Sequence, residues 1–274
     1  MATALVTGGT SGIGAQFARR LAERGDDLVI VARDRGRLDE VAAQLHASYG
    51  INVETIRADL ADRADVARVA ARIENPDRPI DTVVNNAGIG VHVAISDPDS
   101  SVHEHAFDVM CRAVLVLSSA AARAMRARGG GAIITVSSLQ SFLTTGSYSA
   151  IKAWVTTFTQ SLAVELHGTG VRVTAVLPGW VATEWHERAG VRTSSIPDWL
   201  WSDPDDVARI ALRDSDRGRV VCIPTLRYRV LGWFARALPL WLVRSVSRRL
   251  SSRRRADRAL DASEPLENAT DGGR

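Results

Sequence analysis

A tyrosine and a lysine four residues apart are the pair in this sequence with the clearest chemical potential. Tyr148 and Lys152 occupy positions i and i+4, so in a helix their side chains lie on one face, one turn apart. A tyrosine has a reference pKa near ~10 and is a poor proton donor or acceptor at neutral pH. Because a neighbouring ammonium favours the phenolate, we expect Lys152 to lower the pKa of Tyr148 and the pair to serve proton transfer.

Lys152 is also the only lysine in a chain that has 33 arginines. At every other basic position the sequence has arginine. Lys152 is the exception, and its compact, rotatable ammonium differs chemically from the planar guanidinium of arginine. A chance surface lysine is the alternative, but the position four residues after a tyrosine favours a functional role.

Serine hydroxyls follow an apolar run that ends shortly before this pair. Because side chains alternate along a strand, Ser138 shares a face with Val136 and Ile134, whereas Ser137 points the other way. The two adjacent serines are therefore expected to face different surroundings. Only ten residues separate Ser138 from Tyr148, so the intervening loop is short.

The elements that must position these residues alternate between apolar runs and helix-length segments. The apolar runs lack polar alternation, which is typical of parallel strands buried on both faces. Stretches such as Ala15–Glu23, Leu38–Tyr49 and Val66–Ile73 have helix-like composition and lie between them. This order predicts βαβ units and a doubly wound α/β sheet. The expected strands are Leu5–Val6, Leu28–Val31, Val53–Ile56, Thr82–Val84, Ala132–Val136, Val171–Leu177 and Val220–Ile223.

A glycine-rich segment, Thr7 to Gly14, follows the first expected strand and opens the first expected helix. A helix N-terminus presents unpaired N–H groups and the positive end of a dipole, which suit a pyrophosphate. Glycines there let the backbone approach a ligand without interference from a Cβ atom. An ordinary tight turn is the alternative, but the place between strand and helix favours dinucleotide binding. The spacing is T-G-x-x-x-G-x-G rather than G-x-G-x-x-G.

Four motifs, in this order, resemble those of the short-chain dehydrogenase/reductase family. They are the glycine segment, Asn85–Gly88 after the fourth strand, the Y-x-x-x-K of Tyr148 and Lys152, and Pro178-Gly179 after the sixth strand. Together they span roughly residues 2–224. The resemblance implies a Rossmann-type fold in a single domain and an NAD(P)-dependent oxidoreductase acting on alcohol or carbonyl groups.

The resemblance also implies a role for each motif. Ser138 would hold the oxygen of a substrate carbonyl, Tyr148 would act as general acid or base, and Lys152 would also hydrogen-bond the nicotinamide ribose. No metal ligands are implied. The implied cofactor-binding residues are Gly8, Thr10, Ser11, Gly12, Ile13, Gly14, Arg33, Asp59, Leu60, Asn86, Ala87, Gly88, Tyr148, Lys152, Pro178, Gly179, Val181 and Thr183.

The residues after the second strand bear on the choice of nicotinamide cofactor. An acid there accepts the ribose 2′-hydroxyl of NAD, whereas an arginine suits the 2′-phosphate of NADP. The acid's position holds Ala32 and is followed by Arg33, whose guanidinium can form two hydrogen bonds to a phosphate. The sequence therefore favours NADP(H) over NAD(H). A shift of one residue would make Asp34 the acid, and a plain surface arginine is the alternative for Arg33.

Two features depart from the family pattern. Many members have an asparagine in the helix between the fourth and fifth strands, and it holds a water that relays protons to the lysine. Here Met110 takes that place and Cys111 follows, so Cys111, or backbone and water, must substitute. Ordinary core packing is the alternative for both residues. The segment Glu184–Trp201 is long and rich in tryptophan, which is typical of a lid, although a structural role is equally open.

The C-terminal part of the chain differs from the rest in charge. Residues 1–224, the expected NAD(P)-binding catalytic domain, carry 23 basic and 26 acidic side chains, whereas residues 225–274 carry 11 arginines and 5 acids. Residues 225–258 interleave Trp, Phe and Leu with arginines, which predicts a basic amphipathic extension lying on an anionic membrane. The alternatives are a helix that packs on the body, roofs the active site or forms a dimer face. Residues 259–274 show no hydrophobic period and are expected to be disordered.

The composition excludes several other classes of protein. With 46% apolar and 24% charged residues the chain is neither wholly disordered nor fibrous. Two cysteines cannot form a disulfide framework, no signal peptide is visible, and no run of about 18 uncharged apolar residues exists. We therefore expect a cytoplasmic protein that at most lies on the inner face of a membrane. The slightly acidic body argues against nucleic acid as a partner, and the family resemblance suggests a homo-oligomer.

These observations predict an NADPH-dependent carbonyl reductase. The tryptophan-rich segment and the apolar tail favour a hydrophobic or lipid-like substrate over a sugar. The alternatives are an NAD-dependent alcohol dehydrogenase that works oxidatively, and a weakly catalytic protein that binds the cofactor as a sensor.

Overall fold

Seven parallel strands form one sheet in the order β3-β2-β1-β4-β5-β6-β7. The computed structural model describes residues 2–91, 93–181, 198–237, 239, 241–245 and 247–248. Each strand coincides with an expected apolar run, so the predicted doubly wound fold in a single domain is confirmed. The strands are β1 (Thr3–Thr7), β2 (Asp27–Ala32), β3 (Val53–Arg57), β4 (Thr82–Asn85), β5 (Gly131–Val136), β6 (Val171–Val176) and β7 (Val221–Cys222).

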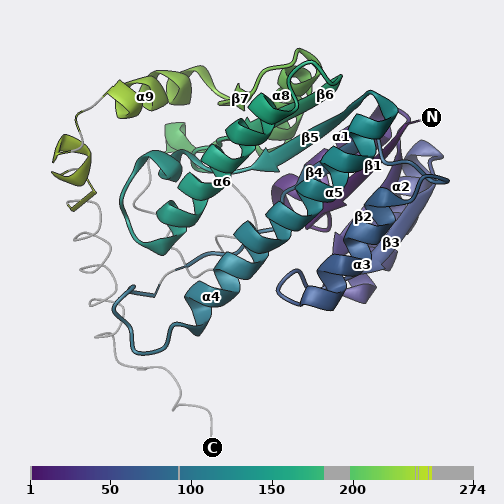
Figure 1. The fold of residues 1–274 in the computed structure, drawn as a ribbon, viewed down its shortest axis with the longest axis horizontal. Coiled ribbons are helices and arrows are strands. Elements are labelled where there is room, and N and C mark those ends of the chain that lie inside the picture. The colour runs from purple at the N-terminus through teal and green to yellow at the C-terminus, as the bar shows by residue number, and fades with distance from the viewer. Residues whose placement is uncertain are drawn as a thin grey trace, which may run out of the picture.

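Helices cover both faces of the sheet and enclose one apolar core on each face (Figure 1). Alternating residues of β1 supply the two cores, with Leu5 in one and Ala4 and Val6 in the other. On one face lie α1 (Gly12–Glu23), α2 (Arg35–Tyr49) and α8 (Pro204–Asp216), and on the other α3 (Arg63–Glu74), α5 (Ala113–Arg128) and α6 (Ser147–Glu165). The remaining elements are α4 (Ser101–Phe107), the π-helical turn η1 (Asp108–Arg112), the 3₁₀ turns η2 (Leu139–Phe142) and η4 (Asp198–Leu200), and α9 (Leu226–Ala237).

One continuous helical stretch, Ser101–Arg128, is long and apolar enough to cross a membrane by length and composition. Its most apolar window, however, is 61% buried within the fold. Leu117, Ala121 and Met125 of this stretch belong to the core on its face of the sheet. The stretch therefore has the burial expected of a core helix.

The strand order reverses between β1 and β4, so the loops that follow these two strands diverge to opposite faces of the sheet. In doubly wound sheets a ligand binds at this point, beyond the carboxyl ends of the strands. Gly8 leaves β1 there and donates its N–H to the carbonyl of Val31, at 2.8 Å. The glycine segment, the Asn85–Gly88 motif and the end of β5 thus meet at one edge of the sheet.

Helix α9 packs against the body at the end of the molecule opposite the N-terminus (Figure 1). Arg229 donates from Nε to the carbonyl of Ile223 at 2.9 Å, and its Nη2 lies 3.7 Å from Asp214. Asp214 is a buried carboxylate that also pairs with Arg213 and Arg219. A charge buried in this way is stable only with such partners, so this cluster fixes the start of α9 to α8 and β7. The expected tail at 259–274 lies outside the described residues.

Candidate active site

The loop after β1 is held in place by polar groups of its own chain. Thr7 Oγ1 accepts hydrogen bonds from the N–H groups of Asn86 (2.9 Å) and Ala87 (3.1 Å). Asn86 Nδ2 in turn donates to the carbonyls of Thr7 (3.0 Å) and Gly8 (3.3 Å). A Cβ atom on Gly14 would stand 2.1 Å from the Gly8 oxygen, so only glycine fits there. Asn86, predicted as a cofactor residue, braces the loop, and Thr7 is a bracing residue that the sequence analysis did not single out.

The N-terminus of α1, the positive end of the helix dipole, has no side-chain cap. Ser11 is the N-cap of α1, yet its side chain makes no capping hydrogen bond, and the first turn contains no acidic residue. By contrast, Asp34, Asp62 and Asp203 cap α2, α3 and α8 through their carboxylates. The segment Thr10–Gly14 therefore presents N–H groups and a helix dipole with no carboxylate in the first turn of α1, which fits the pyrophosphate of a dinucleotide.

Three arginines gather beyond the ends of β2 and β3. Arg33 is exposed, its carbonyl accepts from Arg57 Nε at 3.2 Å, and Arg37 Nη2 lies 3.5 Å from the carbonyl of Thr10. Asp34 accepts the N–H of Arg37 at 3.1 Å as the cap of α2. Asp34, the alternative candidate to bind the ribose of NAD, thus has its carboxylate engaged as the N-cap of α2.

Asp59 and Leu60, the expected adenine-contacting pair, lie just beyond the end of β3. Asp59 Oδ1 accepts the N–H of Ala61 at 2.9 Å, and the Asp59 N–H donates to Asp65 at 2.7 Å. The Asp59 side chain therefore orders the turn before α3, while Leu60 is buried.

Ser138 and Tyr148 meet at the carboxyl end of β5. Their side chains are hydrogen-bonded, and Ser138 Oγ also accepts the N–H of Gln140 at 3.1 Å, as the cap of η2. Burial raises the pKa of Tyr148 to about 12, and the bond to Ser138 only partly opposes this. Contrary to the expectation from the spacing, Lys152 does not bring this pKa below its usual range in the protein by itself, because desolvation of the phenolate dominates and the ammonium lies 5.7 Å from the ring centre.

Lys152 is almost fully buried, at 4% exposure, on the face of α6 that also carries Tyr148. Its Nζ donates to the carbonyl of Val136 at 3.0 Å. Burial lowers the pKa of Lys152 to about 8, against a smaller opposing effect of Cys111. Ser137, on the other side of the strand end, donates to the Lys152 carbonyl at 2.8 Å and pairs with Thr156 at 2.7 Å. The adjacent serines thus have separate contacts, Ser138 with Tyr148 and the turn η2, and Ser137 with the backbone and Thr156 of α6.

Met110 and Cys111 lie beside the lysine, in the π-helical turn η1. Both are buried at 1% exposure and belong to the apolar core. A Cβ atom built on Gly88 would be 3.3 Å from Met110 Sδ and 3.8 Å from Lys152 Nζ, so the three residues adjoin. Burial raises the pKa of Cys111 to about 12, so it stays a neutral thiol. The polar partner observed for the ammonium is the backbone carbonyl of Val136, one of the substitutes that the sequence analysis left open.

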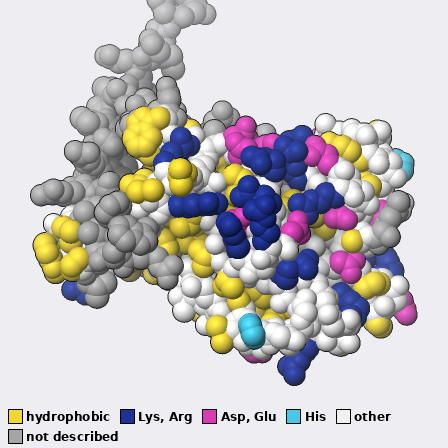
Figure 2. Space-filling view, turned by 90° about the horizontal axis from the view of Figure 1, so that it is seen from above, with side chains coloured by type: hydrophobic (Ala, Val, Ile, Leu, Met, Phe, Trp, Pro, Cys, Tyr) yellow, Lys and Arg dark blue, Asp and Glu magenta, His cyan; other side chains and the backbone are white. Residues whose placement is uncertain are grey.

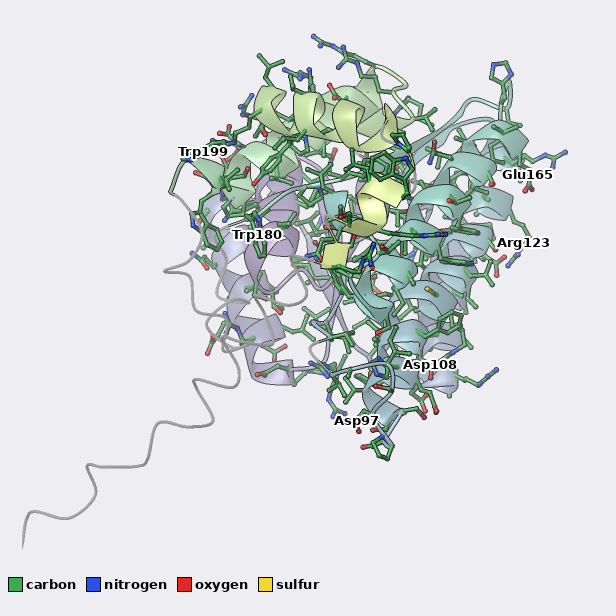
Figure 3. All side chains as sticks on the ribbon, turned by 90° about the vertical axis from the view of Figure 1, so that its left-hand side faces the viewer. Asp97, Asp108, Arg123, Glu165, Trp180 and Trp199 are labelled. Atoms are coloured by element: carbon green, nitrogen blue, oxygen red, sulfur yellow. The ribbon has the colours of Figure 1, made fainter. Side chains whose placement is uncertain are left out.

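The loop after β6 reaches the same edge of the sheet. The Leu139 N–H donates to the Pro178 carbonyl at 3.0 Å, and Val181 pairs with Ser202 in an isolated bridge. The rings of Trp180 and Trp201 lie 6.2 Å apart, and Figure 3 shows Trp180 and Trp199 on one side of the molecule, away from Asp97 and Asp108. Thr183 and residues 184–197 of the expected lid lie outside the described residues.

The comparisons with known proteins agree with this arrangement. Residues 2–192 match the family model described as short chain dehydrogenase. A short-chain dehydrogenase from Sphingobium yanoikuyae, solved in complex with NADPH, is 33% identical with a TM-score of 0.78, and the match covers 99% of both chains. The bulky-bulky ketone specific alcohol dehydrogenase from Comamonas testosteroni is 30% identical with a TM-score of 0.74, over 98% of this chain and 97% of that one. Galactitol 2-dehydrogenase (L-tagatose-forming) of Cereibacter sphaeroides is 34% identical over 224 residues, 77% of this chain and 86% of the relative.

The fold and the site therefore define an NAD(P)-dependent oxidoreductase. The chain belongs to the short-chain dehydrogenase family, as its motifs indicated.

The buried ammonium predicts a pH limit on activity. Because the pKa of Lys152 is about 8, the group loses its proton as the pH rises through that value. The kcat/KM for carbonyl reduction should fall with a single ionisation near pH 8, while Tyr148, with a pKa of about 12, stays protonated. Lys152→Arg, whose guanidinium stays charged, should be slower overall but lack this break. A wild-type profile that is flat to pH 9.5, or the same break in both proteins, would contradict the assignment.

Proposed function

We propose that the protein is an NADPH-dependent carbonyl reductase acting on a hydrophobic or lipid-like ketone. The observation that carries the proposal is the buried Tyr148 hydroxyl, hydrogen-bonded to Ser138 and with a pKa raised to about 12. At neutral pH this phenol keeps its proton, so the proton that carbonyl reduction requires is in place beside Ser138. Because a high pKa also makes that proton harder to release, the tyrosinate left behind needs stabilisation, which we assign to Lys152.

The residues divide the reaction as follows. NADPH, when bound, supplies the hydride that goes to the carbonyl carbon. Ser138 donates a hydrogen bond to the carbonyl oxygen and so favours the charge that develops there. Tyr148 gives that oxygen its proton, and the resulting alcohol leaves. Lys152 stabilises the tyrosinate that remains, because an ammonium one helical turn away attracts it.

The preference for NADPH is supported by charge at the end of β2. Arg33 directly follows β2, a position where an arginine suits a ribose 2′-phosphate, and Arg57 Nε bonds its carbonyl while Arg37 reaches the carbonyl of Thr10. The nearest acid, Asp34, is used as the cap of α2. An NAD-dependent dehydrogenase working oxidatively is the second candidate, and a sensor that binds cofactor with little turnover is the third.

The apolar character of the substrate is supported by the groups around the short loop after Ser138. A Cβ atom on Gly232 of α9 would contact Leu139 at 3.4 Å and Phe142 at 3.6 Å. Thr144 in the same loop donates its N–H to Ser247 Oγ at 3.1 Å. The C-terminal part therefore abuts the loop beside the reacting groups, and a relative with this fold is named for bulky ketones.

We also propose that residues 225–258 extend the catalytic domain of residues 1–224 and contact an anionic membrane with their outer surface. Leu226, Val230, Leu231 and Trp241 are exposed, and Figure 2 shows hydrophobic side chains gathered at this end of the molecule. No acidic residue occurs between Asp216 and Asp257. The protein would then be a cytoplasmic homo-oligomer that lies peripherally on the inner face of a membrane.

The catalytic proposal predicts that purified protein oxidises NADPH when a bulky apolar ketone is added, and does so poorly with ketoses. Tyr148→Phe should lower kcat by about 10²–10⁴-fold, since it removes the proton donor, yet bind NADPH as before. NADPH consumption followed by absorbance tests both. NADPH binding without turnover of any ketone would favour the sensor, and faster alcohol oxidation with NAD would favour the dehydrogenase.

The cofactor preference predicts a selective loss in Arg33→Ala. Removing a charge-assisted hydrogen bond should weaken NADPH binding by about 10–100-fold while NADH binding stays unchanged. Tryptophan fluorescence titration measures both constants. Arg35→Ala is the matched control, because this neighbouring arginine is exposed and pairs with Asp39. Equal affinity of Arg33→Ala and wild type for NADPH would exclude the role.

The membrane proposal predicts co-sedimentation with vesicles that contain anionic phospholipid, and none with purely zwitterionic vesicles. The double variant Leu226→Asp, Val230→Asp should abolish binding and keep reductase activity, because both side chains point outward, at 75% and 49% exposure. Val164→Asp, at 78% exposure on α6, is the control. Unchanged sedimentation of the double variant would remove the proposal.

A further inference from the structure

Tyr228 is a buried tyrosine on the inner surface of α9 that none of the motifs includes. It is 4% exposed. Its hydroxyl donates to the carbonyl of Leu200 at 2.5 Å and accepts the N–H of Trp180 at 3.1 Å. Its ring lies against Gly179, where a Cβ atom would stand 2.1 Å from Tyr228 Cζ. One side chain therefore contacts both the loop after β6 and the segment that ends in η4.

Hydrogen bonds to other segments hold the described part of the loop after β6. The Pro178 carbonyl accepts from Leu139 at 3.0 Å, and the Trp180 carbonyl accepts from Ser202 at 2.8 Å. The Trp180 N–H is bonded by Tyr228. Burial raises the pKa of Tyr228, so the hydroxyl keeps the proton that it donates to Leu200. The tyrosine thus links α9 to two segments, the loop after β6 and η4, which the Val181–Ser202 bridge also joins to each other.

Helix α9 is in turn held firmly enough to act as a support. Arg227 Nη2 donates to the carbonyl of Trp201 at 2.6 Å, and its guanidinium lies 5.5 Å from the centre of the Tyr228 ring. Arg229, which follows Tyr228 in the chain, bonds the carbonyl of Ile223 and pairs with the buried Asp214. The contacts of Arg227 and Arg229 therefore fix α9 and with it the Tyr228 hydroxyl. The hydroxyl in turn holds the loop after β6 through the Trp180 N–H.

We propose that Tyr228 is a positioning residue that holds the Pro178–Val181 loop in the conformation needed at the nicotinamide end of the cofactor. This inference rests on the proposed function and on the family resemblance, which implies that Pro178, Gly179 and Val181 bind the cofactor. The Leu139–Pro178 hydrogen bond places this loop next to Ser138, beside the half of NADPH that would react. A phenylalanine would fill the same space on Gly179 but leave the Trp180 N–H and the Leu200 carbonyl without the hydroxyl. The structural contribution of the ring and the positioning contribution of the hydroxyl can therefore be separated.

The test compares two ligands in Tyr228→Phe. Binding of NADPH should weaken about three- to tenfold, the loss expected for one hydrogen bond. Binding of adenosine 2′,5′-bisphosphate, which lacks the nicotinamide half, should be unchanged. Tyr49→Phe is the matched control, because Tyr49 lies on α2 and its hydroxyl contacts only a surface glutamate in the described part of the chain, at 3.4 Å. Both constants are measured by fluorescence titration, with melting temperatures recorded for each variant.

A second variant, Gly179→Ala, displaces the ring without removing the hydroxyl and should show the same selective loss for NADPH. Tyr228→Phe that binds both ligands like wild type would overturn the inference, and so would an equal loss for both ligands, which reports general damage. If Tyr228→Phe is not obtained folded, Gly179→Ala with wild-type NADPH affinity overturns it instead. Failure of wild type itself to bind NADPH would be a failure of the proposed function, and the two results are distinguishable.

Discussion

A single ammonium group, buried between the end of β5 and helix α6, constrains most of the active site. A buried charge needs a hydrogen-bond partner, and the Val136 carbonyl at the last residue of β5 provides one for Lys152. The strand must therefore end where the helix passes, and Ser137 fixes that contact by bonding the Lys152 carbonyl and Thr156. The next residue, Ser138, then points to the opposite side and meets Tyr148. The Ser138 and Tyr148 hydroxyls are placed by the same packing that buries the lysine.

Local patterns in the sequence predicted this half of the site well. Strand alternation separated Ser137 from Ser138, and the i, i+4 spacing placed Tyr148 and Lys152 on one face, because both depend only on backbone geometry. The glycine segment was predicted for a similar reason: its place between a strand and a helix follows from the hydrophobic pattern. The seven strands were found because parallel strands buried on both faces leave uninterrupted apolar runs.

The remaining features depend on contacts between distant parts of the chain, which a local pattern does not contain. Tyr228 bonds Trp180 across 48 positions, and no feature of the sequence around either residue indicates the pairing. Thr7 looks like a strand end, yet its hydroxyl accepts two N–H groups from the segment after β4. The pKa of Tyr148 was predicted in the wrong direction because spacing reveals the neighbouring charge but not the depth of burial, and burial dominates.

The opposite shifts of the two pKa values bear on proton transfer at Tyr148. Burial disfavours the charged form of each group, so it raises the pKa of Tyr148 to about 12 and lowers that of Lys152 to about 8. The resting pair at neutral pH is then a phenol and an ammonium, since pH 7 lies below both values. Alcohol oxidation needs a base to take the hydroxyl proton, and a phenol with so high a pKa is reluctant to supply its anion. Proton donation to a carbonyl oxygen leaves the same tyrosinate, so burial alone opposes proton transfer at Tyr148 in both directions. Stabilisation of the phenolate by neighbouring groups, Ser138 among them, must offset that cost.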